Sequence, residues 1–592
     1  MVTAGSRTTP STVPVVRQGA ATARRLLVEM AAQHWNVETD SLSVAKGIIT
    51  HRTSERTLRY ADLSQSAEIA DAFQQNVAPD IELTPRMDWT VIGSSVVRPN
   101  LRDLVTSTHR YPSDITLPEM LYGKILRPPS YGATLKSIDF SPAEAMPDVV
   151  VVRDGAFIGF AAPTTYRAAQ ALDAVASTAR WETVSHPSSD ELFDYLKQHV
   201  RPGRAQTRGD IAKAVADAHQ VLEARYEVAY VQHAPMEPRA ATARWQDGKL
   251  TVWTGVDGPQ RVQGDLARSL GIPTERVRVI VPDMGGGFGG KHTGEAAEEA
   301  ARLARAARCP VAVHWTRAEE FTWAYFRPAA LIESQAALDQ NGRLTAWDFT
   351  NINAGGSAID PPYQIPCTRV LSSNSESPLR QGAYRGLAAT ANNFARESFI
   401  DELAQMAAVD PLQFRLQHLQ DSRIRTVLEV AAQRFDWATR RAKVTPEIGV
   451  GLACGTEKNS VVAACVEVRV DRRKGEFHVS EVCEAFECGP IQNPANLTSQ
   501  VQGCIMMGMG AASREAIEFK DGKITNAAFS DYRVPRFRDL PKIDVHLVDN
   551  TEIPSAGAGE TPIIAIAPAI ANAIFAATGT PVRSMPIRLP SS

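Results

Sequence analysis

The sequence predicts an α+β protein of several domains. Its 592 residues can build more than one core, and 44% hydrophobic with 22% charged residues is the composition of an ordinary globular protein. Short apolar strands and amphipathic helices alternate irregularly from about Ala214 to the C-terminus, and no internal repeat is evident. These observations together indicate irregular α+β domains.

The charge balance and the cysteines argue against several classes of function. A formal net charge of −3 gives no electrostatic reason to expect nucleic acid or an anionic membrane as a partner. The seven cysteines form no Cys-x-x-Cys pair, so we expect neither a zinc site nor an iron–sulfur cluster on this chain. The longest apolar run is interrupted by Pro568 and Asn572, so we expect no transmembrane segment.

The N-terminal part predicts a small helical and stranded unit. A loop at 5–14 precedes an amphipathic helix at 18–33, and a strand, turn and strand follow at 47–59. A proline-containing linker at 76–86 then marks a boundary.

A second unit is predicted between 88 and 184. The stretch "MPDVVVVRDGAFIGFAA" (146–162) reads as a buried strand, an Asp-Gly turn and a second strand. The helix predicted for "TYRAAQALDAVASTA" follows at once and would cover this hairpin.

Three features stand out in the remaining sequence. The stretch "VRVIVPDMGGGFGGKH" (277–292) predicts a strand followed by a glycine-rich loop, and an alanine-rich helix is predicted at Gly294–Ala307. The stretch Thr561–Gly579 predicts an apolar helix of small residues that ends at a glycine C-cap.

The glycine-rich loop "GGGFGGKH" (285–292) nearly matches the phosphate-binding loop of nucleotide hydrolases. The match fails at His292, where that motif needs a hydroxyl for Mg²⁺. Five glycines in the six residues 285–290 still predict that backbone N–H groups approach a ligand closely. A P-loop nucleotide hydrolase, with Lys291 as its phosphate lysine, therefore stays an alternative.

Glu560 is the only charged residue between Ile553 and Val582. A lone carboxylate among glycines and apolar residues is costly to bury without a partner. Its position before the apolar helix predicts either a residue that stabilises the helix N-terminus or a general base whose pKa burial raises.

The chain resembles the molybdenum-binding large subunit of the xanthine dehydrogenase/aldehyde oxidase family. Within it, the isoquinoline 1-oxidoreductase beta subunit and the nicotinate dehydrogenase type are most similar. Five motifs in the family's order carry the resemblance: "HAPMEPRAATARW", "DMGGGFGGKH", "QGAYRGLAATANNFARESFIDELAQ", "ECGPIQNPANLTSQVQGC" and "GAGETPIIAIAPAIANAIFAATG".

The resemblance implies three domains. Residues 1–85 would form a partial second molybdopterin-binding domain that lacks its N-terminal portion. Residues 86–190 would form an α/β-hammerhead-like domain, and residues 191–592 the large mixed molybdopterin-binding catalytic domains.

The resemblance also implies an oxidative hydroxylation of an N-heteroaromatic compound or an aldehyde, with water as the source of oxygen. The cofactor would be molybdopterin cytosine dinucleotide, whose molybdenum has oxo, sulfido and hydroxyl ligands and is held by the pterin dithiolene without a protein ligand. Electrons would leave to a small subunit with two-iron two-sulfur clusters, and then to an FAD subunit or a cytochrome.

The resemblance assigns roles to individual residues. Glu560 would be the catalytic base, Arg385 would orient the substrate, and Phe288 and His292 would line the substrate pocket. Cofactor binding would fall to Ser6, Arg7, Thr8, Gly286, Gly287, Phe288, Gly289, Tyr384, Arg385, Gln500, Gln502, Gly503, Gly557, Ala558 and Gly559.

The sequence departs from the family pattern at three places. His292 stands where purine-oxidising relatives have a second glutamate, so xanthine is not the expected substrate. Val256-Asp257 stands where many relatives have Thr-Gln, and Gln260 is a candidate replacement for that glutamine. The stretch "GTEKNS" (455–460) resembles a Gly-Thr-Glu-Met-Gly-Gln-Gly motif but lacks its Gln-Gly end.

A fourth departure concerns the N-terminus. In isoquinoline-type subunits a further cofactor-binding segment precedes the stretch that corresponds to 3–12. We therefore expect a separate chain to supply that segment, a reading frame that begins upstream, or an incomplete chain. A non-catalytic truncated subunit or assembly partner stays an alternative. The family implies a bacterial protein of the cytoplasm or periplasm, and the N-terminus carries no signal peptide of its own.

Overall fold

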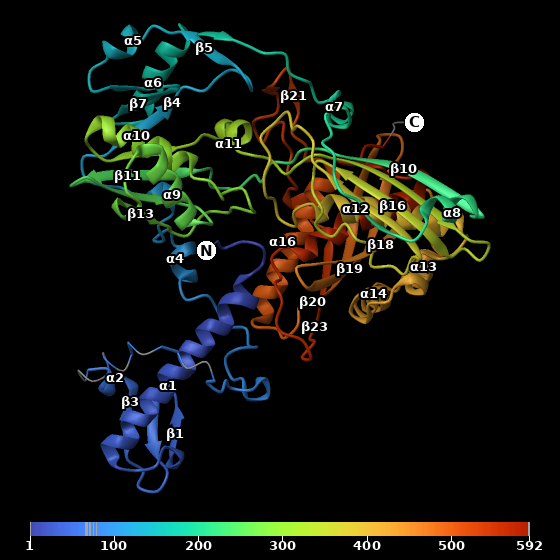
Figure 1. Ribbon diagram of the computed structural model, residues 1–592, viewed down its shortest axis with the longest axis horizontal. Coiled ribbons are helices and arrows are strands. Elements are labelled where there is room, and N and C mark those ends of the chain that lie inside the picture. The colour runs from blue at the N-terminus through green and yellow to red at the C-terminus, as the bar shows by residue number, and fades with distance from the viewer. Residues whose placement is uncertain are drawn as a thin grey trace.

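The computed structural model describes residues 2–65, 69, 71, 73–74, 76–77 and 80–589. Figure 1 shows a small N-terminal unit at the lower left, a sheet with its helices at the upper left and a larger body at the right. The mixed α/β architecture confirms the predicted fold class.

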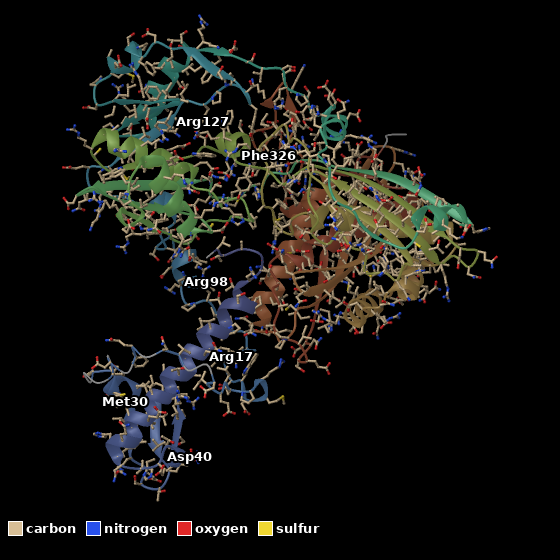
Figure 2. The ribbon with its side chains drawn as sticks, viewed as in Figure 1. Arg17, Met30, Asp40, Arg98, Arg127 and Phe326 are labelled. Atoms are coloured by element: carbon tan, nitrogen blue, oxygen red, sulfur yellow. The ribbon has the colours of Figure 1, made fainter. Side chains whose placement is uncertain are left out.

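The N-terminal unit packs the helix α1 against a three-stranded antiparallel sheet of order β1-β2-β3. Its core includes Leu27, Ala31, Leu42 and Ile49. Figure 2 places Met30 and Asp40 at the far end of this unit, away from the larger body. The elements are α1 (Val13–Trp35), β1 (Leu42–Ala45), β2 (Ile48–His51), β3 (Thr57–Arg59) and α2 (Tyr60–Leu63).

The predicted helix at 18–33 and the strand pair at 47–59 are therefore present. Of the predicted linker at 76–86, residues 78–79 lie outside the described residues. A mostly irregular segment follows and contains the short helix α4 (Leu101–Val105). It leads the chain back to the upper sheet (Figure 1).

The upper sheet has seven strands in the order β13-β12-β11-β14-β4-β7-β6. The helix α10 (Glu295–Ala307) packs on it, and its Leu303 fills the space that Gly123 and Gly159 leave free of side chains. The strands are β4 (Leu121–Ile125), β6 (Val150–Asp154), β7 (Phe157–Ala162), β11 (Ala240–Gln246), β12 (Lys249–Thr254), β13 (Val277–Ile280) and β14 (Val311–His314).

This sheet crosses the expected boundary between 86–190 and 191–592. The parallel pairing of β14 with β4 joins Val311–Val313 to Leu121–Gly123. The two expected domains therefore share one sheet, which is held together by strands far apart in the sequence. The elements around it are β5 (Thr134–Ser137), α5 (Ser141–Glu144), α6 (Thr165–Ala176), β8 (Arg180–Glu182), α9 (Pro259–Leu270) and α11 (Arg317–Trp323), whereas α7 (Leu192–Gln198) packs on β15 of the larger body.

Two further sheets build the larger body, with orders β24-β10-β15-β16-β17-β9 and β18-β19-β20-β23. The strands are β9 (Gln206–Arg208), β10 (Gln220–Val228), β15 (Ala330–Leu338), β16 (Leu344–Ile352), β17 (Cys367–Ser373), β18 (Ile448–Glu457), β19 (Ser460–Asp471), β20 (Glu476–Glu487), β23 (Lys542–Val548) and β24 (Ser584–Met585). A small hairpin adds β21 (Phe519–Lys520) and β22 (Lys523–Ile524).

The helix α12 contacts strands of both sheets and is buried over residues 389–404. Its charged side chains are paired inside the core, because Arg415 Nε lies 2.9 Å from Glu397 Oε2 and Arg415 Nη1 lies 2.6 Å from Asp401 Oδ1. The helices of this body are α8 (Ile211–Ala216), α12 (Ala389–Met406), α13 (Pro411–His418), α14 (Ser422–Phe435), α15 (Trp437–Arg441), α16 (Pro494–Ser513) and α17 (Ile566–Thr578).

The predicted apolar helix is α17 together with the 3-10 turn η7 (Thr561–Ala565), and Gly579 ends it with φ +71°. Among the described residues, Thr561–Thr578 is the one helical stretch long and apolar enough to cross a membrane, and 89% of it is buried inside the protein. The sequence suggested a run broken at Pro568 and Asn572, but the helix continues through both. Pro568 lies in the first turn of α17, where its missing N–H costs no helical hydrogen bond.

Glycines in β18 let α17 approach the sheet backbone. A Cβ on Gly449 would lie 1.9 Å from Ala573 O, and one on Gly451 would lie 2.2 Å from Ala573 N. Asn572 Nδ2 also donates to Leu452 O at 2.9 Å. This packing fixes where α17 begins and therefore where Glu560 lies.

Candidate active site

A cavity of about 760 Å³ lies where several distant parts of the chain meet. The N-terminal residues form one wall, and the glycine-rich loop forms another. The segments around Arg385 and Glu560 form two more, and single residues from other segments fill the gaps between them. The lining residues are Val2, Thr3, Ala4, Gly5, Ser6, Arg7, Asp257, Gly287, Phe288, Gly289, His292, Ala383, Tyr384, Arg385, Leu387, Lys458, Gln500, Gly559 and Glu560.

The glycine-rich loop needs glycine for both conformation and space. Gly286 and Gly289 have φ values of +100° and +95°, which L side chains rarely adopt. A Cβ on Gly289 would lie 3.0 Å from Ala383 O, and one on Gly290 would lie 2.7 Å from the His233 ring. The loop backbone therefore packs directly against the segment that carries Arg385.

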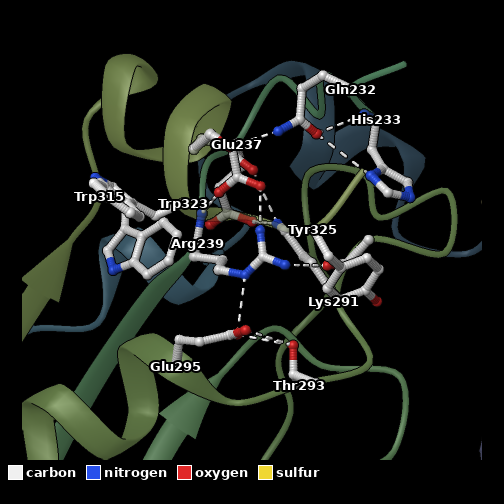
Figure 3. A network of polar contacts seen from close by, with 12 residues as sticks. Gln232, His233, Glu237, Arg239, Lys291, Thr293, Glu295, Trp315, Trp323 and Tyr325 are labelled. Carbon is white, nitrogen blue, oxygen red and sulfur yellow. Dashed lines mark hydrogen bonds and ion pairs between the residues drawn. The ribbon is translucent and has the colours of Figure 1, made fainter. Parts of the chain in front are cut away.

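A buried polar network supports the glycine-rich loop (Figure 3). Lys291 is 1% exposed, and its Nζ donates to the backbone oxygen of Glu237 at 2.9 Å. Glu237 Oε2 accepts a hydrogen bond from the Gly285 amide at 2.8 Å. Burial lowers the pKa of Lys291, while the Glu237 carboxylate raises it. The lysine of the near-P-loop motif thus points into the protein and anchors the loop.

Arg239 and His233 complete this support. The Arg239 guanidinium pairs with Glu320 and also donates to the backbone oxygen of Gly290. Burial lowers the pKa of His233 to about 3, so its ring is neutral at physiological pH. His233 Nε2 donates to Ala383 O at 2.7 Å. These contacts tie the glycine-rich loop and residues 383–385 into one rigid unit.

The Arg385 guanidinium connects two other walls of the cavity. Its Nε donates to Gly559 O at 2.6 Å, and its Nη2 donates to Gln500 Oε1 at 2.7 Å. Its backbone amide donates to Phe288 O at 2.9 Å. Because Arg385 is 8% exposed, these hydrogen bonds are largely shielded from water.

Glu560 lies at the start of η7 but does not cap it, because its side chain makes no hydrogen bond to the turn. The residue is half-buried and lines the cavity, and its Oε2 has no hydrogen-bond partner among the described residues. Burial raises the pKa of Glu560 and the Glu457 carboxylate adds to this, while Lys458, Arg385 and the Gly5 amide lower it. The geometry therefore favours a reactive carboxyl group over a helix-stabilising one.

The N-terminal segment packs closely on the loop before Glu560. A Cβ on Gly557 would lie 2.1 Å from Ser6 O, and one on Gly559 would lie 3.0 Å from Ser6 Oγ. The Thr3 amide donates to Asp257 O at 2.8 Å, which joins the same segment to the opposite wall.

Families of molybdopterin cofactor-binding domains match residues 193–419 and 388–541. The chain belongs to the molybdopterin-binding oxidoreductases of the xanthine dehydrogenase/aldehyde oxidase type. It is 30% identical to a nicotinate dehydrogenase subunit of Pseudomonas putida, over 98% of this chain and 52% of that protein. It is 29% identical to the isoquinoline 1-oxidoreductase beta chain of Brevundimonas diminuta, over 99% of this chain and 83% of that protein.

The chain thus spans about half the length of the Pseudomonas putida relative. Solved structures of the family share its fold. Quinoline 2-oxidoreductase from Pseudomonas putida 86 superposes with a TM-score of 0.75 at 17% identity, over 84% of this chain and 97% of that one. Aldehyde oxidoreductase from Desulfovibrio gigas superposes with a TM-score of 0.77 at 17% identity, over 89% of this chain and 83% of that one.

The residues of this cavity suit a molybdopterin. Gly287, Gly289 and Gly559 line the cavity without side chains, and the buried Oε2 of Glu560 and Oγ of Ser6 lack partners among the described residues. Gln500 could present its amide to a pterin edge. When bound, the cofactor would supply the molybdenum centre and its capacity for two-electron chemistry.

The structure brings most of the sequence-predicted site residues to this cavity. Those that line it are Ser6, Arg7, Gly287, Phe288, Gly289, His292, Tyr384, Arg385, Gln500, Gly559 and Glu560. Gly286, Gly557 and Ala558 belong to the same loops without lining it, and Thr8 begins the turn η1 (Thr8–Thr12). Gln502 and Gly503 are exposed on α16. The roles of all these residues stay predictions.

Other lining residues were not predicted as part of the site. Lys458 faces the cavity from the β18–β19 turn, and Val2 to Gly5 form its N-terminal wall. Asp257 lies in the wall, with Oδ2 3.1 Å from His292 Nδ1. Gln260, considered as a replacement for the glutamine of relatives, is instead exposed on α9. Only the unusual "GTEKNS" sequence could have drawn attention to Lys458.

Proposed function

We propose that this chain is the catalytic subunit of a molybdenum hydroxylase. Its reaction would convert R–H and water to R–OH, releasing an electron pair and two protons, with an N-heteroaromatic compound or an aldehyde as R–H. The observation that carries the proposal is the meeting of Glu560 with Arg385 and the glycine-rich loop around one cavity.

The chain's own residues have distinct tasks in this proposal. Glu560 would accept the proton that the attacking oxygen loses, because its carboxyl group is half-buried and Oε2 is free of partners among the described residues. Arg385 would keep the Gly559 loop in place through its 2.6 Å hydrogen bond to the Gly559 oxygen. Phe288, 43% exposed, would present an aromatic face to the substrate.

The finer assignments belong to the same proposal. The cofactor would be molybdopterin cytosine dinucleotide, with Ser6, Arg7 and Thr8 near its phosphates. Electrons would pass to a small two-iron two-sulfur subunit, then to an FAD subunit or a cytochrome, in the cytoplasm or periplasm of a bacterium. An N-heteroaromatic substrate is favoured by the relatives named for nicotinate and isoquinoline.

Metal and cofactor analysis of the purified complex tests the proposal. We expect molybdenum, CMP released by hydrolysis of the cofactor, and turnover with quinoline- or pyridine-type compounds or with aldehydes. A metal-free, folded complex without turnover on either substrate class would contradict the proposal and support a non-catalytic assembly partner.

A further inference from the structure

The tight turn between β18 and β19 carries an unusual cation. Lys458 and Asn459 are its two central residues, since Glu457 pairs directly with Ser460, and they have φ values of +51° and +66°. Two-residue turns with two positive φ values favour asparagine and glycine. Asn459 fits this preference and Lys458 does not, so the turn alone gives no reason for a lysine.

The turn is attached to the loop that carries Glu560. Thr561 Oγ1 donates to Glu457 O at 2.6 Å, and Ser460 Oγ donates to Gly557 O. The two residues that flank Lys458 and Asn459 therefore hold both ends of the 557–561 segment. Because these hydrogen bonds involve backbone oxygens, the turn and the Glu560 loop keep a fixed relative position.

Lys458 lines the same cavity as Glu560. Its Nζ lies 2.9 Å from Glu457 Oε1, and that oxygen also accepts a hydrogen bond from Ser357 Oγ at 2.9 Å. With a side chain that is 29% exposed, Lys458 is only partly screened by water.

The other charged and polar groups around Glu560 come from the Lys458 turn and from four further parts of the chain. Arg385 is the second cation near Glu560, but its guanidinium already bonds Gly559 O and Gln500. The remaining groups are the Glu457 carboxylate beside Lys458, the Gly5 amide, and the cavity-lining side chains of Arg7, Asp257 and His292.

We propose that Lys458 is a positioning residue that keeps Glu560 deprotonated. This inference rests on the proposed role of Glu560 as the base. A base must be ionised to accept a proton, and burial in the cavity wall opposes ionisation of Glu560. The Lys458 ammonium opposes that effect, and Glu457 holds the ammonium in place.

The direction of the effect follows from charge. An ammonium nearby lowers the pKa of Glu560, whereas burial raises it. Removing the cation should therefore raise the pKa and leave Glu560 protonated up to a higher pH. A change of about one pH unit is typical for the loss of one nearby opposite charge.

Three variants of the full chain separate charge from turn geometry. Lys458→Gln removes the cation, Lys458→Arg keeps it, and Asn459→Gly keeps the charge and suits the positive φ at the neighbouring turn position. If Lys458 acted only as a turn residue, Lys458→Gln and Lys458→Arg would behave alike.

The first measurement needs no bound cofactor or turnover. A carbodiimide with excess small amine modifies protonated carboxyl groups, and peptide mass spectrometry gives the extent of labelling at Glu560 against pH. We expect the midpoint to rise by about one pH unit in Lys458→Gln and to stay unchanged in Lys458→Arg and Asn459→Gly. An unchanged midpoint in Lys458→Gln would overturn the proposal.

The second measurement uses the complex loaded with molybdenum. The midpoint of the acidic limb of kcat/KM against pH should rise by about one pH unit in Lys458→Gln and should equal the wild-type value in Lys458→Arg. If the wild-type complex shows no turnover, the proposed function fails, but the labelling midpoint still decides whether Lys458 lowers the pKa of Glu560. A loss of kcat in Lys458→Gln that is equal at every pH would contradict a charge role.

Discussion

Arg385 Nε donates a 2.6 Å hydrogen bond to the backbone oxygen of Gly559, the residue directly before Glu560. The same guanidinium donates to Gln500 Oε1 on α16 at 2.7 Å, and the Arg385 amide donates to Phe288 O at 2.9 Å. One residue thus sets the position of the Glu560 loop relative to both the glycine-rich loop and α16. In this arrangement Arg385 acts through backbone placement as well as charge.

Replacing Arg385 by lysine should therefore impair turnover while the charge is kept. Lysine cannot reproduce the forked pair of hydrogen bonds to Gly559 O and Gln500. A shift of about 1 Å in a catalytic group can cost about 100-fold in rate, so we expect a loss of that order in kcat. Steady-state kinetics on the molybdenum-loaded complex measures it. Wild-type kcat in Arg385→Lys would mean that charge alone suffices.

The glycine-rich loop offers a matched pair of variants. Gly289 has φ +95° and no room for a Cβ, whereas Gly155 has φ +61° and nothing within 4 Å of an added Cβ. Both alanine variants carry the cost of a positive φ, about 1–2 kcal/mol, but only Gly289→Ala pushes the loop away from Ala383. We expect Gly289→Ala to lose most of its molybdenum and Gly155→Ala to keep it, as elemental analysis would measure. Equal molybdenum contents would contradict the close packing of this loop.

Lys291 should matter for stability and not for nucleotide hydrolysis. Lys291→Met leaves the Glu237 carboxylate buried without its cation, which typically costs about 3–5 kcal/mol. Urea unfolding measures this loss. ATP hydrolysis by the wild type that disappears in Lys291→Met would instead favour a P-loop enzyme, and the inward direction of Lys291 argues against that outcome.

The close contact between α17 and β18 predicts that one added methyl group lowers the free energy of unfolding strongly. In Gly451→Ala the new Cβ would meet Ala573 N at 2.2 Å, so α17 must move or the strand must bend. We expect a loss of about 3 kcal/mol or more in unfolding free energy. Gly264→Ala on α9 is the control, because nothing lies within 4 Å and alanine favours helix by up to about 1 kcal/mol. Similar free energies of unfolding for the two variants would contradict the packing described.

Local patterns in the sequence predicted those elements whose structure depends mainly on neighbouring residues. The small apolar residues of Thr561–Gly579 predicted the buried helix, and its glycine end is at Gly579 as expected. The Asp-Gly turn predicted the β6–β7 hairpin, which forms with Asp154 opposite Phe157. The glycine density at 285–290 predicted a close backbone approach to a ligand, which stays a prediction. The structure shows Gly289 and Gly290 in close approach to Ala383 and His233 of the protein itself.

Long-range packing decided what the sequence did not predict. The pairing of β14 with β4 joins strands almost two hundred residues apart, so no local pattern indicates the shared sheet. Lys458 faces the cavity because Ser460 and Thr561 attach its turn to the Glu560 loop, a contact between distant segments. The inward direction of Lys291 likewise depends on Glu237, which belongs to another motif.

Glu560 is the proposed base of a molybdenum hydroxylase. The variant Glu560→Gln tests this role, measured as molybdenum content and turnover of the same purified complex. Glutamine keeps the shape of the side chain but cannot accept the proton, and loss of a general base typically costs about 100- to 10,000-fold. We predict wild-type molybdenum content with kcat reduced by at least about 100-fold. Undiminished turnover in a variant that retains its molybdenum would contradict the assignment of Glu560.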